Sequence, residues 1–167
     1  MNDQIVEIEA PGLQILVHSP AFTRELEEGG RYADKLADGR DLVDHMNDGH
    51  LLAVGIRWPT EGYWLHFSSS MDHRIIARAS DHAVFRLSVR EQQLCVRGGD
   101  DLFRWKRRVP DEQVVTAEDG DYLVTAMMTP YAGDGQVRIY FHFARAGLAA
   151  DIGYSEVPEL FCESPLL

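Results

Sequence analysis

Phe85-Arg86-Leu87-Ser88-Val89 decides the fold, because apolar and polar side chains alternate along it. An alternation with a period of two places the apolar side chains on one face of a β-strand and the polar ones on the other. The same alternation runs through Tyr63-Trp64-Leu65-His66-Phe67 and through residues 137–143. These three segments are therefore predicted to be strands that each bury one face.

Shorter apolar runs predict further strands, and turn signals separate them. The runs lie at 4–9, 13–18, 52–58, 74–79, 93–97, 113–117 and 122–128. Gly, Pro and Asp cluster between them, for example in Pro59-Thr60-Glu61-Gly62 and in Gly133-Asp134-Gly135. This spacing predicts a single domain over residues 1–167. We expect it to be mainly β, an antiparallel β-sandwich or open barrel of about 8 to 10 strands.

Residues 21–48 interrupt the strand pattern. Leu42, Val43 and Met46 have the i, i+1, i+4 spacing of a helix face, and Asp41 favours the start of that helix. We expect one or two short helices in this insertion, which would follow a hairpin formed by the first two strands.

The charge of the chain is negative and uneven. It carries 27 acidic and 16 basic residues, a formal net charge of −11. This sign argues against nucleic-acid binding, because phosphate backbones require a cationic surface. Residues 23–48 hold eight acids and four bases, and 109–135 hold six acids and no base, whereas 72–108 hold nine bases and five acids. Such a field favours attraction to a basic partner.

The composition indicates a protein of the cytoplasm. No apolar run approaches the roughly 18 to 20 residues of a membrane helix, so we expect no membrane partner. Met1-Asn2-Asp3-Gln4 lacks the basic start and apolar core of a secretion signal. Cys95 and Cys162 form no CxxC motif and no disulfide framework. We expect two reduced thiols, with Cys95 buried in a strand, and no cofactor.

No motif for catalysis is present. A Gly-x-Ser-x-Gly elbow, a phosphate-binding loop and a dinucleotide fingerprint are all missing. Ser68-Ser69-Ser70 is interpreted as a polar loop, since serine clusters are ordinary loop chemistry. We therefore predict no catalytic residues and no enzymatic activity.

Asp44-His45-Met46-Asn47-Asp48-Gly49-His50 offers an alternative. Asp44, His45, Asp48 and His50 could hold a metal ion, as a metal-dependent enzyme or a metal-binding domain. Against this, the two histidines are five residues apart, not the four of a helical zinc site, and Gly49 breaks the helix between them. The favoured interpretation is a helix end followed by a turn, with no metal.

Phe103-Arg104-Trp105-Lys106-Arg107-Arg108 combines basic and aromatic side chains. Arginines beside a tryptophan can grip phosphate or stack on a base. Two other interpretations are a solvated edge strand and internal pairing with the acidic segment 111–121. The net charge favours these two, and the choice between a binding patch and an edge strand at 104–108 stays open.

Acidic residues of the insertion form the predicted binding face. A rigid β scaffold commonly carries its function on an inserted loop. A negative face there could occupy a basic active-site cleft in place of phosphates. The residues predicted to contact the partner are Glu25, Glu27, Glu28, Asp34, Asp38, Asp41 and Asp44.

Several short motifs follow one another in a recognisable order. They are Leu13-Gln14-Ile15-Leu16-Val17-His18, Phe22, a segment with Gly30 and Tyr32, the hairpin from 85–89 to 94–96, and Gly120-Asp121-Tyr122-Leu123-Val124-Thr125. In this order, over about two thirds of the chain, the sequence resembles the competence protein J-like proteins, bacterial inhibitors of a DNA-entry nuclease. The segment 104–108 and the tail from 146 have no counterpart. The resemblance implies a β-sandwich that binds and blocks a nuclease, with no catalytic residue carried over.

We therefore predict a non-catalytic inhibitor, of the kind of a bacterial immunity protein. It would bind a cognate toxin or nuclease through the acidic face and occlude a basic active site, with Trp58, Trp64 or Tyr131 as apolar anchors. Two alternatives stay open: the metal site described above, and a β domain that binds a small ligand in an apolar pocket.

Overall fold

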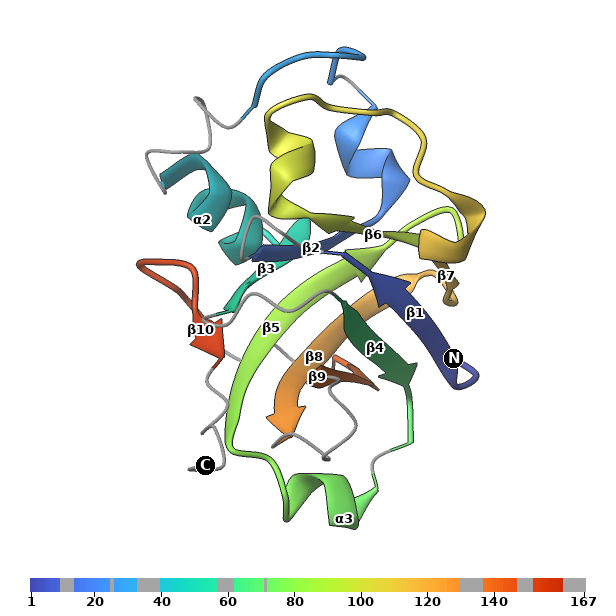
Figure 1. The fold of residues 1–167 in the computed structure, drawn as a ribbon, viewed down its shortest axis with the longest axis vertical. Helices are drawn as coiled ribbons and strands as arrows, with labels where there is room; N and C mark the ends of the chain where they lie inside the picture. Colours follow the sequence, from blue (N-terminus) through green and yellow to red (C-terminus); the bar gives the residue numbers. More distant parts are fainter. Residues whose placement is uncertain are drawn as a thin grey trace.

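The computed structural model describes residues 1–9, 14–24, 26–32, 40–56, 62–70, 72–129, 137–146 and 152–160. Within them, two five-stranded sheets pack face to face around a hydrophobic core (Figure 1). The first sheet has the order β1 (Gln4–Ile8), β4 (Tyr63–Ser68), β9 (Val137–Arg145), β8 (Gly120–Thr129), β5 (Asp81–Val89). The second has the order β10 (Glu159–Leu160), β3 (Leu51–Ile56), β2 (Gln14–His18), β6 (Gln93–Gly98), β7 (Val114–Thr116). The predicted mainly β sandwich is confirmed, and the described strands close no barrel.

Most neighbouring strands are antiparallel, as predicted, but two pairs are parallel. β4 runs parallel to β9, and β10 runs parallel to β3. The expected hairpin of the first two strands is wrong, because β1 and β2 lie in different sheets. β1 pairs with β4, whereas β2 lies between β3 and β6. Each sheet therefore combines strands from distant parts of the chain.

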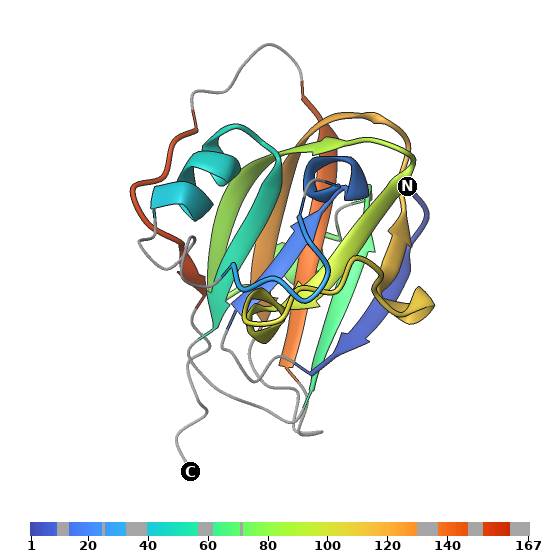
Figure 2. The ribbon, with the colours of Figure 1, turned by 90° about the horizontal axis from the view of Figure 1, so that it is seen from above.

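The two sheets differ in how they are buried. β4 and β9 of the first sheet alternate between buried and partly exposed side chains, which confirms the period of two in the sequence. β2, β3 and β6 of the second sheet bury side chains on both faces. Short helices and loops cover the outer face of the second sheet, as Figure 2 shows from above. We call these segments the covering layer.

The covering layer contains η1 (Pro20–Thr23), α2 (Arg40–Asn47) and η2 (Gly99–Leu102). α2 is the helix predicted from Leu42, Val43 and Met46, and all three side chains are buried. Another short helix, η3 (Asp111–Gln113), precedes β7. In the part of the chain that the structure describes, no helix has the length and apolar character needed to cross a membrane.

The predicted strand at 74–79 is wrong, because α3 (His73–Ile76) and a turn occupy this segment. The Asp72 side chain caps the helix by accepting a hydrogen bond from the Arg74 N–H at 2.8 Å. A cap of this kind satisfies a donor that the first turn leaves free. Ile76 is 41% exposed, whereas Ile75 is partly buried beside side chains of the first sheet.

One side chain joins the edges of the two sheets. The Gln4 carboxamide donates to the Thr116 carbonyl at 2.8 Å and accepts from the Thr116 N–H at 2.9 Å. β1 and β7 are edge strands of different sheets. The Gln4 amide therefore takes the place of a neighbouring strand for Thr116 and closes one corner of the sandwich.

Replacing Phe141 with alanine should destabilise the protein far more than replacing its neighbour Tyr140. Phe141 is 1% exposed and stacks on Phe67 in the core, whereas Tyr140 is partly exposed and stacks on His66. We expect Phe141→Ala to cost about 3–5 kcal/mol and Tyr140→Ala about 1 kcal/mol. Urea unfolding of both variants measures the difference, and equal losses would contradict the one-sided burial of β9.

Candidate protein-binding surface

A buried arginine lies at the centre of the covering layer. Arg97, on β6, is 1% exposed, and its guanidinium lies 4.0 Å from the ring centroid of Trp105. Its Nε–H donates to Nε2 of His18, on the adjacent strand β2, at 3.0 Å. Two neighbouring strands and the segment after η2 therefore meet at one cation.

Few groups balance the charge of Arg97. Its Nη1 lies 3.4 Å from Oδ2 of Asp101, and its Nη2 lies 3.5 Å from the carbonyl oxygen of Arg107. Burial lowers the pKa of Arg97, and the Asp101 carboxylate opposes that shift. Because a guanidinium stays protonated in proteins, the cluster depends on these acceptors.

The contact with Arg97 fixes the protonation state of His18. Arg97 can only donate, so Nε2 of His18 accepts and Nδ1 carries the proton. Nδ1–H donates to the Ser19 carbonyl at 3.1 Å. Burial lowers the pKa of His18 to about 4, and the charge of Arg97 adds a smaller effect in the same direction. The imidazole is therefore neutral at neutral pH.

The acidic loop 26–32 is hydrogen-bonded to the basic segment 102–108. The Gly29 N–H donates to the Trp105 carbonyl at 2.7 Å, and the Trp105 N–H donates to the Gly30 carbonyl at 2.9 Å. These paired bonds satisfy backbone groups on both segments. The loop is thus attached to the buried cluster through the backbone of Trp105.

The same contacts correct the interpretation of the basic segment. Residues 103–108 form no edge strand, because Trp105 is buried against Arg97 and the backbone around it bends. Among the contacts that the structure describes, the acidic partner of this segment is Glu28, which accepts from the Arg107 N–H at 2.6 Å. The pairing expected with 111–121 is therefore replaced by pairing with the loop.

A hollow of about 300 Å³ opens beside this cluster, on the outer side of the second sheet. Apolar side chains and rings form most of its lining. They are Leu16, Leu26, Leu42, Leu51 and Leu102, together with Phe22, Tyr32, Trp105, His18, His45 and His50. Its volume is at the lower limit of small-ligand pockets, about 300 Å³. An open apolar hollow of this size suits a single anchoring side chain of a partner protein.

The exposed side of α2 borders this hollow and is acidic. Asp41, Asp44 and Asp48 are exposed and follow one another at intervals of three and four residues, which places them on one side of the helix. We call these three residues the acidic helix face. Asp41 also lines the hollow, together with His45 from the same side of α2. The structure thus sets carboxylates beside an apolar hollow.

The predicted contact residues fall on two segments of the covering layer. Glu27 and Glu28 are exposed on the acidic loop, and Asp41 and Asp44 are exposed on α2. The residues Glu25, Asp34 and Asp38 lie outside the described ranges. Because Glu28 accepts from the Arg107 backbone, its carboxylate stabilises the loop, whereas the acidic helix face remains at the surface.

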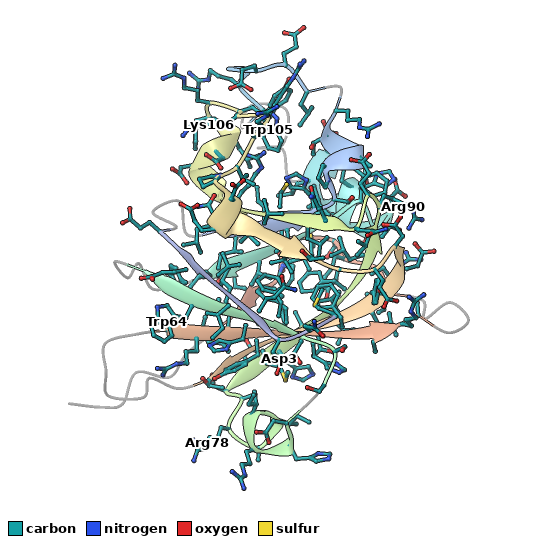
Figure 3. The ribbon with its side chains drawn as sticks, turned by 90° about the vertical axis from the view of Figure 1, so that its right-hand side faces the viewer. Asp3, Trp64, Arg78, Arg90, Trp105 and Lys106 are labelled. Atoms are coloured by element: carbon teal, nitrogen blue, oxygen red, sulfur yellow. The ribbon has the colours of Figure 1, made fainter. Side chains whose placement is uncertain are left out.

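The tryptophan beside the hollow is not the one that the sequence suggested. Trp64 lies on the first sheet, away from Trp105, with the Arg138 guanidinium 5.4 Å from its ring (Figure 3). Trp58 and Tyr131 lie outside the described residues. Trp105 is 3% exposed. Its burial had no clear signal in the sequence, since basic residues flank it on both sides.

His45 and His50 lie together despite their five-residue spacing, with 3.4 Å between their Nδ1 atoms. In the described part of the chain, no three His, Cys, Asp or Glu side chains gather to hold a metal ion. The alternative metal site of Asp44, His45, Asp48 and His50 therefore does not assemble as predicted, because the two aspartates do not join the two histidines. The five-residue spacing, which argued against a helical zinc site, therefore still allows the two rings to meet.

Comparison with known proteins places the fold. No family model and no curated protein matches the chain. The crystal structure of ComJ, an inhibitor of the DNA degrading activity of NucA, from Bacillus subtilis, matches with a TM-score of 0.55 and 9% identity. The match covers 86% of this chain and 96% of ComJ. The predicted resemblance to the competence protein J-like proteins is thus confirmed for the fold.

A second solved structure has a similar fold. It carries the description Crocagin biosynthetic gene J, with a TM-score of 0.50 and 14% identity. This match covers 87% of the present chain and all of the other one. The same sandwich therefore recurs in chains of very different sequence.

Replacing Arg97 with methionine should destabilise the protein by about 1–3 kcal/mol, because His18 and Asp101 lose a buried donor. Arg104 is the matched control: it is exposed and lies in the same layer. Arg104→Met should change the free energy of unfolding by about 0.5 kcal/mol or less. Urea unfolding distinguishes the two, and equal effects would refute the role given to Arg97.

His18 should make the protein less stable in acid. Unfolded histidine titrates near pH 6.5, whereas folded His18 stays neutral down to about pH 4. Its contribution is complete above pH 6.5 and is lost as the pH falls towards 4, because only the unfolded state binds the proton. The loss amounts to about 3 kcal/mol.

The His18→Gln variant isolates this effect, because glutamine still offers Arg97 an acceptor and does not titrate. Unfolding free energies of both proteins are compared between about pH 7.5 and 4.5. The wild type should lose more stability than the variant over this range. Parallel curves would show that His18 is protonated in the folded state.

Proposed function

We propose that this protein is a non-catalytic inhibitor that binds a nuclease and blocks its activity. The observation that carries the proposal is the fold shared, over nearly the whole length of both chains, with an inhibitor of a DNA-degrading nuclease. Because folds host many functions, the proposal also draws on the chemistry of the surface.

The acidic helix face supplies the electrostatic part of this chemistry. A nuclease presents a cationic surface to the phosphates of its substrate. Asp41, Asp44 and Asp48 offer three exposed carboxylates on one side of a helix. The net charge of −11 adds a long-range field of the same sign. The face would therefore take the place of phosphates and accelerate the encounter.

The hollow supplies the apolar part. Interfaces gain most of their affinity from a few anchors that fill desolvated pockets, with charges around them. Here the ring of Trp105 and several leucines line the hollow, and Asp41 is part of the same lining. We place one apolar side chain of the nuclease in this hollow and the basic side chains of the nuclease against the acidic helix face. In this position the protein covers the active site of the nuclease.

The biological class that fits this mode is an immunity protein. Such a protein meets a toxin with nuclease activity inside the cell that it protects, so we place the encounter in the cytoplasm. His18 and Arg97, whose pKa values are lowered by burial, support a binding role over catalysis. Both ring nitrogens of His18 are bonded within the protein, one of them to the buried Arg97, which leaves no free polar group on this imidazole for a substrate.

The proposal is tested by inhibition of DNA degradation. Nucleases encoded near this gene are purified, and cleavage of duplex DNA is followed with increasing amounts of the protein. For the same inhibition, about tenfold more of the triple variant Asp41→Asn, Asp44→Asn, Asp48→Asn should be needed than of the wild type. This difference should become smaller at high salt, because salt screens the charges.

A matched control removes the same charge elsewhere. Glu7, Glu112 and Glu156 are exposed and lie outside the acidic helix face. Their triple replacement by glutamine should leave inhibition within about twofold of the wild type. Equal losses in both triple variants would reject the acidic helix face as the contact. Undiminished cleavage with every neighbouring nuclease would reject the inhibitor function itself.

A further inference from the structure

The two histidines near the end of α2 are brought together by the backbone. The Gly49 N–H donates to the Met46 carbonyl at 3.0 Å, and the His50 N–H donates to the His45 carbonyl at 2.9 Å. Gly49 has a φ of +74°, the left-handed conformation that glycine adopts without strain. This is the Schellman arrangement, and it sets the side chains of His45 and His50 against each other, at the positions where this motif frequently has an apolar contact.

We propose that His45 and His50 form a site for a divalent transition metal ion, with zinc as the best fit. Their Nδ1 atoms face each other at 3.4 Å. Two imidazole nitrogens on one tetrahedral zinc, each bonded at about 2.0–2.1 Å, lie about 3.3–3.4 Å apart. The separation of the two Nδ1 atoms in this structure thus matches the separation that the metal requires.

Because the two Nδ1 atoms are directed at each other, the rings must rotate before both lone pairs can point at one ion. Their centroids are 5.7 Å apart, with 42° between the ring planes. Phe22 stacks on His50 at 4.4 Å and holds that ring, whereas His45 is exposed and can rotate. Zinc would therefore be captured by a fixed ligand, His50, and an adjustable one, His45.

The surroundings favour a cation and leave it accessible. Asp41 lies one helical turn before His45 and lines the same hollow as both histidines. The carboxylates of the acidic helix face add negative charge around the pair. Since the described residues gather no third ligand at this site, a bound ion would complete its coordination with water.

Zinc titration of the metal-free protein by calorimetry tests the proposal without any nuclease, so its result is separate from that of the inhibition test. We expect one zinc ion per chain at neutral pH. His45→Gln should weaken binding at least tenfold. The variant should keep the fold, because His45 is exposed. The controls His73→Gln and His82→Gln change exposed histidines of other elements and should bind like the wild type.

Absence of zinc binding, or equal binding by His45→Gln, would leave the two histidines as a hydrogen-bonded helix end.

Discussion

A single buried cation organises the half of the molecule that we connect with function. Arg97 lies inside the covering layer with one carboxylate and one neutral imidazole as side-chain partners, and the ring of Trp105 lies against it. A buried charge without acceptors would cost several kcal/mol, so the position of each partner is constrained. Through Trp105 this constraint reaches the acidic loop, whose backbone is bonded to the same tryptophan. The hollow is lined by two of these same rings, Trp105 and His18.

The unequal burial of the two sheets explains why the candidate sites gather on one side. The first sheet buries one face in the core and leaves the other face of its strands partly exposed. The second sheet carries an additional layer with helix ends, loops and charged side chains. Irregular segments held on a rigid scaffold can present side chains that strands cannot. The acidic helix face and the histidine pair both belong to α2 and its cap, which pack on the sheet through Leu42 and Met46.

The sequence predicted what depends on local periodicity and missed what depends on long-range contact. Alternation identified β4, β5 and β9, and helical spacing identified α2. Nothing in the alternation of β6 distinguished Arg97 from a surface arginine, because its burial results from residues 99–108 folding back. The contact between His45 and His50 could have been predicted from Gly49, since a glycine after a helix indicates the Schellman turn. The parallel pairs had no local signal, because strand direction is set by the whole topology.

The corner closed by Gln4 has a consequence for the order in which the chain folds. The two hydrogen bonds of its amide span 112 positions, and β1 reaches its sheet only through β4, whose other neighbour is β9. The sheet that contains β1 is thus complete only after β9 has paired with the other edge of β4. Contacts of such sequence separation form slowly, and an unpaired strand edge can associate with other chains meanwhile. Until β9 pairs with it, the free edge of β4 is therefore the part of this sheet that is exposed to such association.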